Sequence, residues 1–172
     1  RQAVKPLCFL SKRVKKQRQR PREFSKLTEA EKQHMVDAIP LITILVAGAD
    51  GKMDDNELEW AEKVTKIRSY DHASKLNDYY KLVSDHFASR INEMVIRLPK
   101  ETAERTQVIS EELAKLNPIL HKLDAFDAAI YYKNFRTFAE HVAEASGGLL
   151  GFASVGPEER AVIELPMLEV FE

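Results

Sequence analysis

Apolar residues recur along most of the chain at the three- and four-residue steps that place them on one face of an α-helix. The first such pattern runs from Thr28 to about Ala49, and Thr28 with Glu31 has the T-x-x-E spacing of a capping box. Pro40 removes one backbone hydrogen bond from this helix and predicts a kink. The residues after Pro40 are apolar on nearly every face, so we expect this half of the helix at the centre of the fold.

Further helical patterns cover the rest of the chain. They span Asp55 to about Tyr70, Ser74 to Leu98 with one break near Ala88, Lys100 to Leu116 with an end at Asn117 and Pro118, Ala125 to about Ala145, and a last helix that opens at Pro157. No β-branched run alternates with polar residues between turn residues, so no strand is predicted. The predicted fold class is all-α, a single compact bundle of about seven helices.

Spacing also assigns two groups of side chains to the core. In the helix that begins at Asp55, the residues at three-residue steps form the predicted buried face: Leu58, Ala61, Val64 and Ile67. The aromatic residues recur at helical spacing as well, so we expect core packing for Trp60, Tyr79, Tyr80, Phe87, Phe135 and Phe138.

One short pattern occurs twice, each time at the end of an apolar helix. Residues 46–51 and 142–147 share the pattern V-A-x-A-[D/S]-G. After each copy an acid stands third from the expected cap of the next helix, Glu57 in the first and Glu159 in the second. A unit of helix, loop and helix is therefore duplicated. We expect the valine of each copy inside the bundle and the acidic corners turned outward.

Carboxylates gather at the first of these corners. Asp50, Asp54 and Glu57 supply oxygen ligands, which calcium and magnesium prefer, and the sequence is similar to the second half of an EF-hand loop. The first-half ligand positions carry no carboxylate, so a complete EF-hand is excluded. The same residues also fit a purely structural corner, which the sequence favours, in which Asp50 with Gly51 ends one helix and Asp54 with Glu57 caps the next.

The other candidate sites lack groups that a metal site, a nucleotide site or an active site requires. His141 and Glu144 lie three residues apart on one helical face, where two groups can share a metal, but no third ligand is evident. The glycine-rich loop at 147–152 lacks the Gly-Lys-Ser/Thr ending of a phosphate-binding loop, which excludes a nucleotide site. No H-E-x-x-H pair and no nucleophile-elbow serine occurs. We therefore predict that the chain is not an enzyme.

Charge is distributed unevenly along the 172 residues. The net charge is −1, but residues 1–22 contain nine Lys or Arg and no acid, which leaves about −10 on the remainder. We assign residues 1–24 to a basic tail, either a solvated arm or a docking arm for anionic lipid, and residues 25–172 to the helical domain. No aromatic residue is interleaved with the clustered basic residues 12–22, so base stacking has no support and a nucleic acid partner is not expected.

The cysteine content and the hydropathy of the chain indicate its cellular compartment. Cys8 is the only cysteine, which excludes an intramolecular disulfide, and the longest apolar run is too short to span a bilayer. We predict a cytoplasmic protein, peripheral to a membrane if the tail docks there.

The duplicated unit resembles the TerB-like tellurite-resistance domains. The resemblance covers about Leu27 to Leu168 and is carried by A-G-A-D-G-K-M-D-D-N-E at residues 47–57 and A-S-G-G-L-L-G-F at residues 145–152. It implies a helical bundle of two related halves, a role in tellurite and other chemical stress, and metal binding through the acidic turns. Ser146 stands where the family has an aspartate, so a site that needs an acid from both halves would be incomplete here.

Three functional hypotheses follow. The first is a non-enzymatic, TerB-like binding or scaffold module that contacts a protein partner and binds calcium or magnesium weakly. Its candidate ligands are Asp50, Asp54, Glu57, Glu144 and Glu159. The second is a metal-dependent hydrolase that uses carboxylates from both halves around a shared ion. The third is a membrane-surface adaptor that acts through the basic tail.

Overall fold

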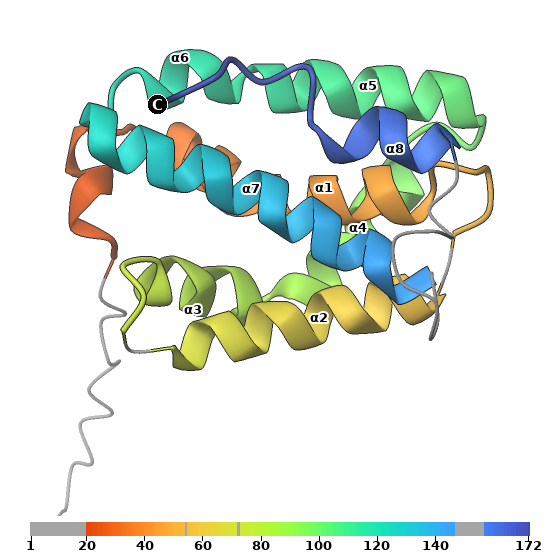
Figure 1. Cartoon of the computed structure of the whole chain (residues 1–172), viewed down its shortest axis with the longest axis horizontal. Helices are drawn as coiled ribbons and strands as arrows, with labels where there is room; N and C mark the ends of the chain where they lie inside the picture. Colours follow the sequence, from red (N-terminus) through yellow and green to blue (C-terminus); the bar gives the residue numbers. More distant parts are fainter. Residues whose placement is uncertain (1–19, 54, 72, 147–156) are drawn as a thin grey trace, which may run out of the picture.

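The computed structural model describes residues 20–53, 55–71, 73–146 and 157–172, which form helices without a strand (Figure 1). In chain order the elements are the 3-10 turn η1 (Arg22–Lys26) and the helices α1 (Glu29–Ala47), α2 (Asp55–Tyr70), α3 (Asn77–Asp85), α4 (Phe87–Arg97), α5 (Thr102–Ala114), α6 (Leu116–Leu120), α7 (Ala125–Ser146) and α8 (Pro157–Ile163). The predicted all-α class is confirmed. None of the described helices combines the length and the apolar character that crossing a bilayer requires.

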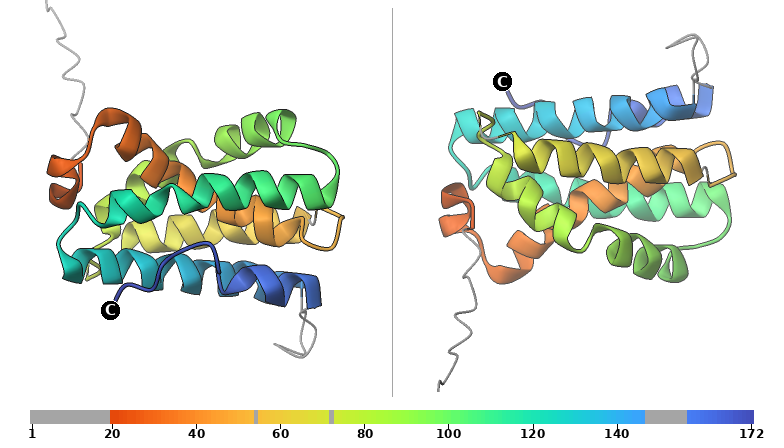
Figure 2. Two further views of the ribbon diagram at one scale, coloured as in Figure 1. Left: turned by 90° about the horizontal axis from the view of Figure 1, so that it is seen from above. Right: turned by 90° about the horizontal axis from the view of Figure 1, so that it is seen from below.

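Helix α1 is the centre of the bundle. It contacts each of the helices α2 to α8, and in the views of Figure 2 it runs between the others. Its second half is buried on all sides, as the apolar run after Pro40 predicts, and the helix continues through that proline. Thr43 tolerates this burial because its hydroxyl donates to the carbonyl of Ile39 at 2.8 Å.

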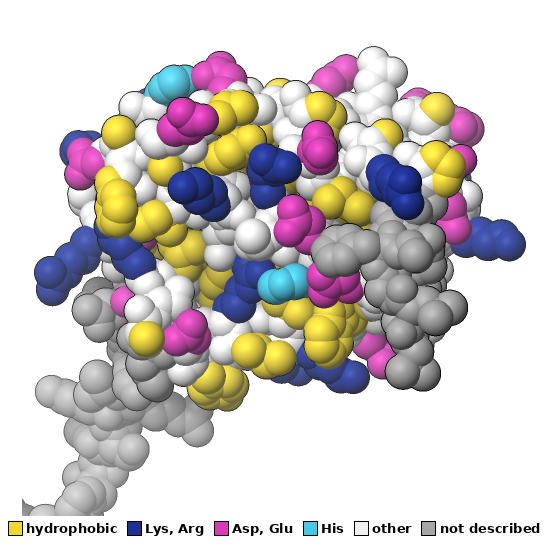
Figure 3. Space-filling view, in the orientation of Figure 1, with side chains coloured by type: hydrophobic (Ala, Val, Ile, Leu, Met, Phe, Trp, Pro, Cys, Tyr) yellow, Lys and Arg dark blue, Asp and Glu magenta, His cyan; other side chains and the backbone are white. Residues whose placement is uncertain are grey.

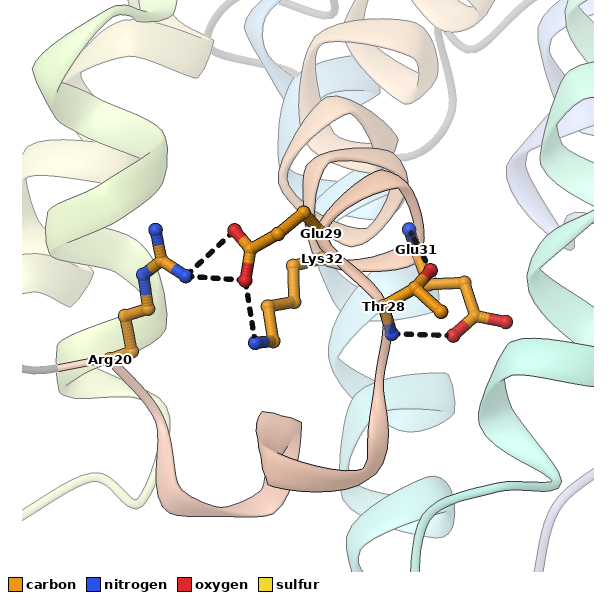
Figure 4. Close-up of polar contacts among 5 residues, drawn as sticks. All are labelled: Arg20, Thr28, Glu29, Glu31 and Lys32. Carbon is orange, nitrogen blue, oxygen red and sulfur yellow. Dashed lines mark hydrogen bonds and ion pairs between the residues drawn. The ribbon is translucent and has the colours of Figure 1, made fainter.

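The first turn of α1 has the predicted capping box (Figure 4). The Thr28 hydroxyl accepts from the Glu31 amide at 3.2 Å, and Glu31 Oε2 accepts from the Thr28 amide at 2.8 Å. These two bonds satisfy backbone N–H groups that a helix start leaves without partners. The same close-up shows Glu29 between Arg20 and Lys32, and these hydrogen bonds hold the pKa of the Glu29 carboxyl below its usual value, with Lys32 the larger cause.

The last residues assigned to the basic tail belong to the fold. Phe24 is only 1% exposed, and its ring lies 6.2 Å from the ring of Tyr79 and 5.7 Å from that of Tyr131. The neighbouring Glu23 accepts a hydrogen bond from the Tyr131 hydroxyl at 2.9 Å. Phe24, the last residue assigned to the tail, therefore packs with the helical domain and anchors η1 on α3 and α7.

The buried face of α2 agrees with the predicted one at Ala61 and Val64, and Leu58 is partly buried against the core, but Ile67 lies outside it. Ile67 is 62% exposed and Trp60 is 38% exposed, whereas the side chains in the core are Glu57, Ala61, Val64, Thr65 and Ser69. Small and polar residues can be buried here because Thr65 and Ser69 each donate to a backbone carbonyl of the same helix. Figure 3 shows hydrophobic side chains at the surface along the lower edge of the molecule, over α2.

The predicted helix end at Asn117 and Pro118 is also wrong. Helix α5 ends at Ala114, and Pro118 lies inside α6. Pro118 is the third residue of that short helix, where a backbone N–H has no partner within the helix, so the missing N–H costs no hydrogen bond. The break predicted near Ala88 is found close by, at His86 between α3 and α4.

Candidate metal site at the acidic corner

The first acidic corner is a tight turn between α1 and α2. Helix α1 ends at Ala47, and the Gly51 amide donates to the carbonyl of Gly48 at 3.1 Å. Gly51 has φ +89°, a left-handed conformation that favours glycine, as the sequence predicts for a helix stop. Asp50 Oδ1 accepts from the amide of Lys52 at 2.9 Å, which fixes the side chain over the turn.

Arg105 of α5 holds this corner against the connection between α4 and α5. Its Nη2 donates to the carbonyl of Gly48 at 2.9 Å and its Nη1 to the carbonyl of Lys100 at 3.0 Å. A cation at the end of α1 is also favoured by the helix dipole. The packing is close, because a Cβ on Gly51 would lie 3.2 Å from Thr102 Oγ1. The sequence does not predict the role of Arg105. Its partners are backbone carbonyls, which every residue has, so no sequence motif identifies them.

The five predicted ligands lie in unlike surroundings. Asp50 is exposed, Glu144 is half-buried, and Glu57 and Glu159 are 1% and 8% exposed. Asp54 lies outside the described residues. Figures 1 and 2 show the start of α2 and the end of α7 at the same end of the bundle, so the fold brings the first corner and the end of α7 to one region. Within the described ranges, however, no three His, Cys, Asp or Glu side chains gather closely enough to hold a metal ion.

Glu57 and Glu159 occupy equivalent positions in their helices. Each is the third residue of its helix, α2 and α8, and each has one carboxylate oxygen fully buried. Glu31 occupies the same position in α1, where it closes the capping box. The free N–H groups of a helix start favour an acid at this position. The burial and placement of the two glutamates therefore agree with the structural interpretation of the corners.

The two copies of the repeated pattern fold differently. Val46 and Val142 are both buried, at 1% and 0% exposure, as expected for the duplicated unit. In the first copy the helix ends at Ala47, the second residue of the pattern. In the second copy α7 continues to Ser146, the fifth residue of the pattern. Glycine at the third position of the first copy favours a helix end, and Glu144 at the same position of the second favours helix. The loop at 147–152 lies outside the described residues.

His141 belongs to a hydrogen-bonded network between α2 and α7. Its Nδ1 lies 3.0 Å from Arg68 Nη2, and because a guanidinium can only donate, the imidazole nitrogen accepts. Arg68 also donates to the Tyr80 hydroxyl at 2.8 Å, and it lies over the rings of Tyr80 and Phe138. Burial raises the pKa of Tyr80 to about 12, so this hydroxyl stays protonated at neutral pH. The partner of His141 in the structure is thus an arginine.

No known protein family, curated protein or solved structure matches the chain in the comparisons.

Proposed function

We propose that the chain is a non-enzymatic binding module of the TerB-like, stress-response type, and that its first acidic corner binds calcium or magnesium weakly. The observation that supports this proposal is the placement of Asp50. It is an exposed carboxylate on a turn that Gly51 shapes and Arg105 holds in place. The burial of the two repeat valines, Val46 and Val142, supports the duplicated architecture that the resemblance implies.

Weak affinity follows from the surroundings of the corner. One Asp50 oxygen already accepts a backbone hydrogen bond, and Glu57 is buried in the first turn of α2. A carboxylate can accept further interactions, but a cation at this corner would keep most of its water shell. Sites with few charged ligands have dissociation constants on the order of 0.1 to 1 mM.

The hydrolase alternative lacks support of this kind. It needs carboxylates of both halves around one ion, and the described part of the chain does not place three such groups together. The membrane-adaptor alternative depends on residues 1–19, which lie outside the described residues. We therefore argue for binding by contact, with protein partners and without a chemical step.

A metal titration of the full chain tests the cation. We expect calcium or magnesium at ~1 to 10 mM to move the amide resonances of residues 50–57 in a saturable way. Asp50→Asn should abolish the shifts, because it removes the exposed charge. The matched control is Asp71→Asn, since Asp71 is also exposed and its Oδ1 likewise accepts from the amide two residues on, at 3.2 Å. Shifts that survive Asp50→Asn, or no shifts in the native chain, would disprove the cation site.

A further inference from the structure

The segment after α8 folds back over α6 and α7 instead of leaving the bundle (Figure 1). Leu165 and Leu168 are buried at 1% and 6% exposure, and the Leu168 amide donates to the Leu165 carbonyl at 3.0 Å. This turn fixes the segment to the core. The residues that follow, 169–172, have no regular secondary structure and are here called the strip.

Asn117 of α6 holds the backbone on both sides of Leu168. Its Nδ2 donates to the carbonyl of Met167 at 3.0 Å, and its Oδ1 accepts from the amide of Glu169 at 2.9 Å. A side-chain amide has both a donor and an acceptor, so it can bind a peptide backbone whatever the side chains are. Contacts of this kind supply affinity for extended peptides, while neighbouring side-chain contacts supply specificity.

The specificity contacts come from residues 121 and 132. His121 Nε2 lies 2.6 Å from Glu169 Oε2, and the ring of Phe171 lies 4.9 Å from that of His121 and 6.2 Å from that of Tyr132. Val170, between the two contact residues, is 68% exposed. An acid and an aromatic residue are thus recognised at alternate positions, as in an extended peptide.

We propose that Asn117, His121 and Tyr132 form a docking site for an extended peptide of a partner protein with the pattern acid, any residue, aromatic. The strip occupies this site in the folded chain. The side chains of His121 and Glu169 are 61% and 57% exposed, so this contact lies at the surface. Phe171 packs against the core but is only half-buried, so the strip can leave while Leu165 and Leu168 keep the turn anchored. Asn117 Nδ2 then stays on the Met167 carbonyl, and Asn117 Oδ1, His121 and Tyr132 become available to the partner peptide. The site shares no residue with the acidic corner, so this inference goes beyond the proposed function and can fail independently of it.

The strip competes with any added peptide for the docking site, because both bind the same side chains. A ligand tethered next to its site has an effective concentration on the order of millimolar, so the strip should mask the site from a weak peptide added in solution. Removing the two contact side chains of the strip should expose the site without disturbing the turn. The full chain with Glu169→Ala and Phe171→Ala together is therefore the form to test.

The probe is a synthetic peptide with the sequence E-V-F-E of residues 169–172, followed by NMR shifts of the Asn117 side-chain amide. We expect saturable binding to the double variant and at least ~10-fold weaker binding to the native chain, because the strip competes. Adding His121→Ala to the double variant should abolish saturation, as should the control peptide K-V-A-E. Circular dichroism of each variant establishes that the helices are intact.

Three results would overturn the proposal. The first is a folded double variant that shows no saturable shift. The second is binding that His121→Ala leaves unchanged. The third is a native chain that forms a dimer by light scattering and loses it on Phe171→Ala, since the occupant would then be the strip of a second copy. If the double variant did not fold, E-V-F-E in large excess over the native chain should still displace the Glu169 amide resonance, and its failure to do so would count equally against the site.

Discussion

A partly buried ion pair joins α1 to α4. Arg90 Nε donates to Asp37 Oδ1 at 3.0 Å and its Nη2 to Oδ2 at 2.5 Å, which is the two-point geometry that arginine forms with a carboxylate. The side chains of Asp37 and Arg90 are 14% and 27% exposed. The pairing raises the pKa of Arg90, mainly through the hydrogen bonds to Asp37. Removal of one partner would leave the other charge half-buried.

Arg90→Met should therefore destabilise the fold. We expect a loss of ~1.5 to 3 kcal/mol in the free energy of unfolding, because Asp37 would keep only the hydrogen bond from the Gln33 side chain. The measurement is urea denaturation. The control is Lys66→Met, whose ion pair with Glu62 is exposed and should contribute less than ~1 kcal/mol. Equal losses in the two variants would contradict the argument.

At the scale of the elements, the buried face of α2 consists of small and polar residues as well as apolar ones. It packs against α3 and α7, and apart from Val64 its buried residues are small or polar. Ala61 has 0% exposure, which allows the neighbouring helices to approach closely. The larger Ile67 lies outside, at 62% exposure. The buried face therefore contains Ala61 and Val64, as predicted, and extends to Thr65 and Ser69 instead of to Ile67.

Two substitutions on α2 test whether Ile67, which the sequence predicts to be buried, lies outside the core while Ala61 lies inside it. Ile67→Lys should change the free energy of unfolding by less than ~0.5 kcal/mol, since surface changes have small effects. Ala61→Leu should cost ~1 to 3 kcal/mol, because the added atoms have no space against the adjoining helices. Thermal unfolding followed by circular dichroism measures both. The reverse order of effects would show that Ile67 faces the core.

Helix existence and ends were predictable where local chemistry sets them. The capping box at Thr28 and the left-handed Gly51 are encoded within four residues, and both are found. The sites that depend on distant partners were not predictable. Asn117 is a predicted helix end but binds backbone of residues 167 and 169, and Arg105 binds carbonyls of two separate connections. The pattern of a single sequence does not indicate which side chain binds a backbone group far away in the sequence. The candidate docking site could therefore not be found without the structure.

At the scale of the whole molecule, η1 closes the open end of the aromatic core. Phe24 contacts the rings of Tyr79 and Tyr131, and the hydroxyl of Tyr79 donates to the carbonyl of Met35 in α1 at 2.7 Å. Burial raises the pKa of Tyr79 well above its usual value, so the hydroxyl remains a donor. Phe24 thus connects the segment before α1 to α3 and α7, and Tyr79 connects α3 to α1.

Phe24→Ala should cost ~3 to 5 kcal/mol in the free energy of unfolding, the usual range for removal of a buried phenylalanine. Chemical denaturation measures the loss. Phe126→Ala is the matched control, because Phe126 is 69% exposed and contacts the ammonium group of Lys75 at 4.9 Å from the ring centre. Such an exposed contact contributes less than ~1 kcal/mol. If both variants lost the same stability, η1 would not be part of the core.

The central position of α1 has a consequence for the order of synthesis. Its apolar second half is made early, yet α7, one of its main packing partners, begins only at Ala125. At ~5 to 20 residues per second, a ribosome needs several seconds to add the intervening chain. During that interval the nascent helix has no complete surface to bury against. The growing polypeptide is therefore most exposed to aggregation, and most in need of a chaperone, before its second half has emerged.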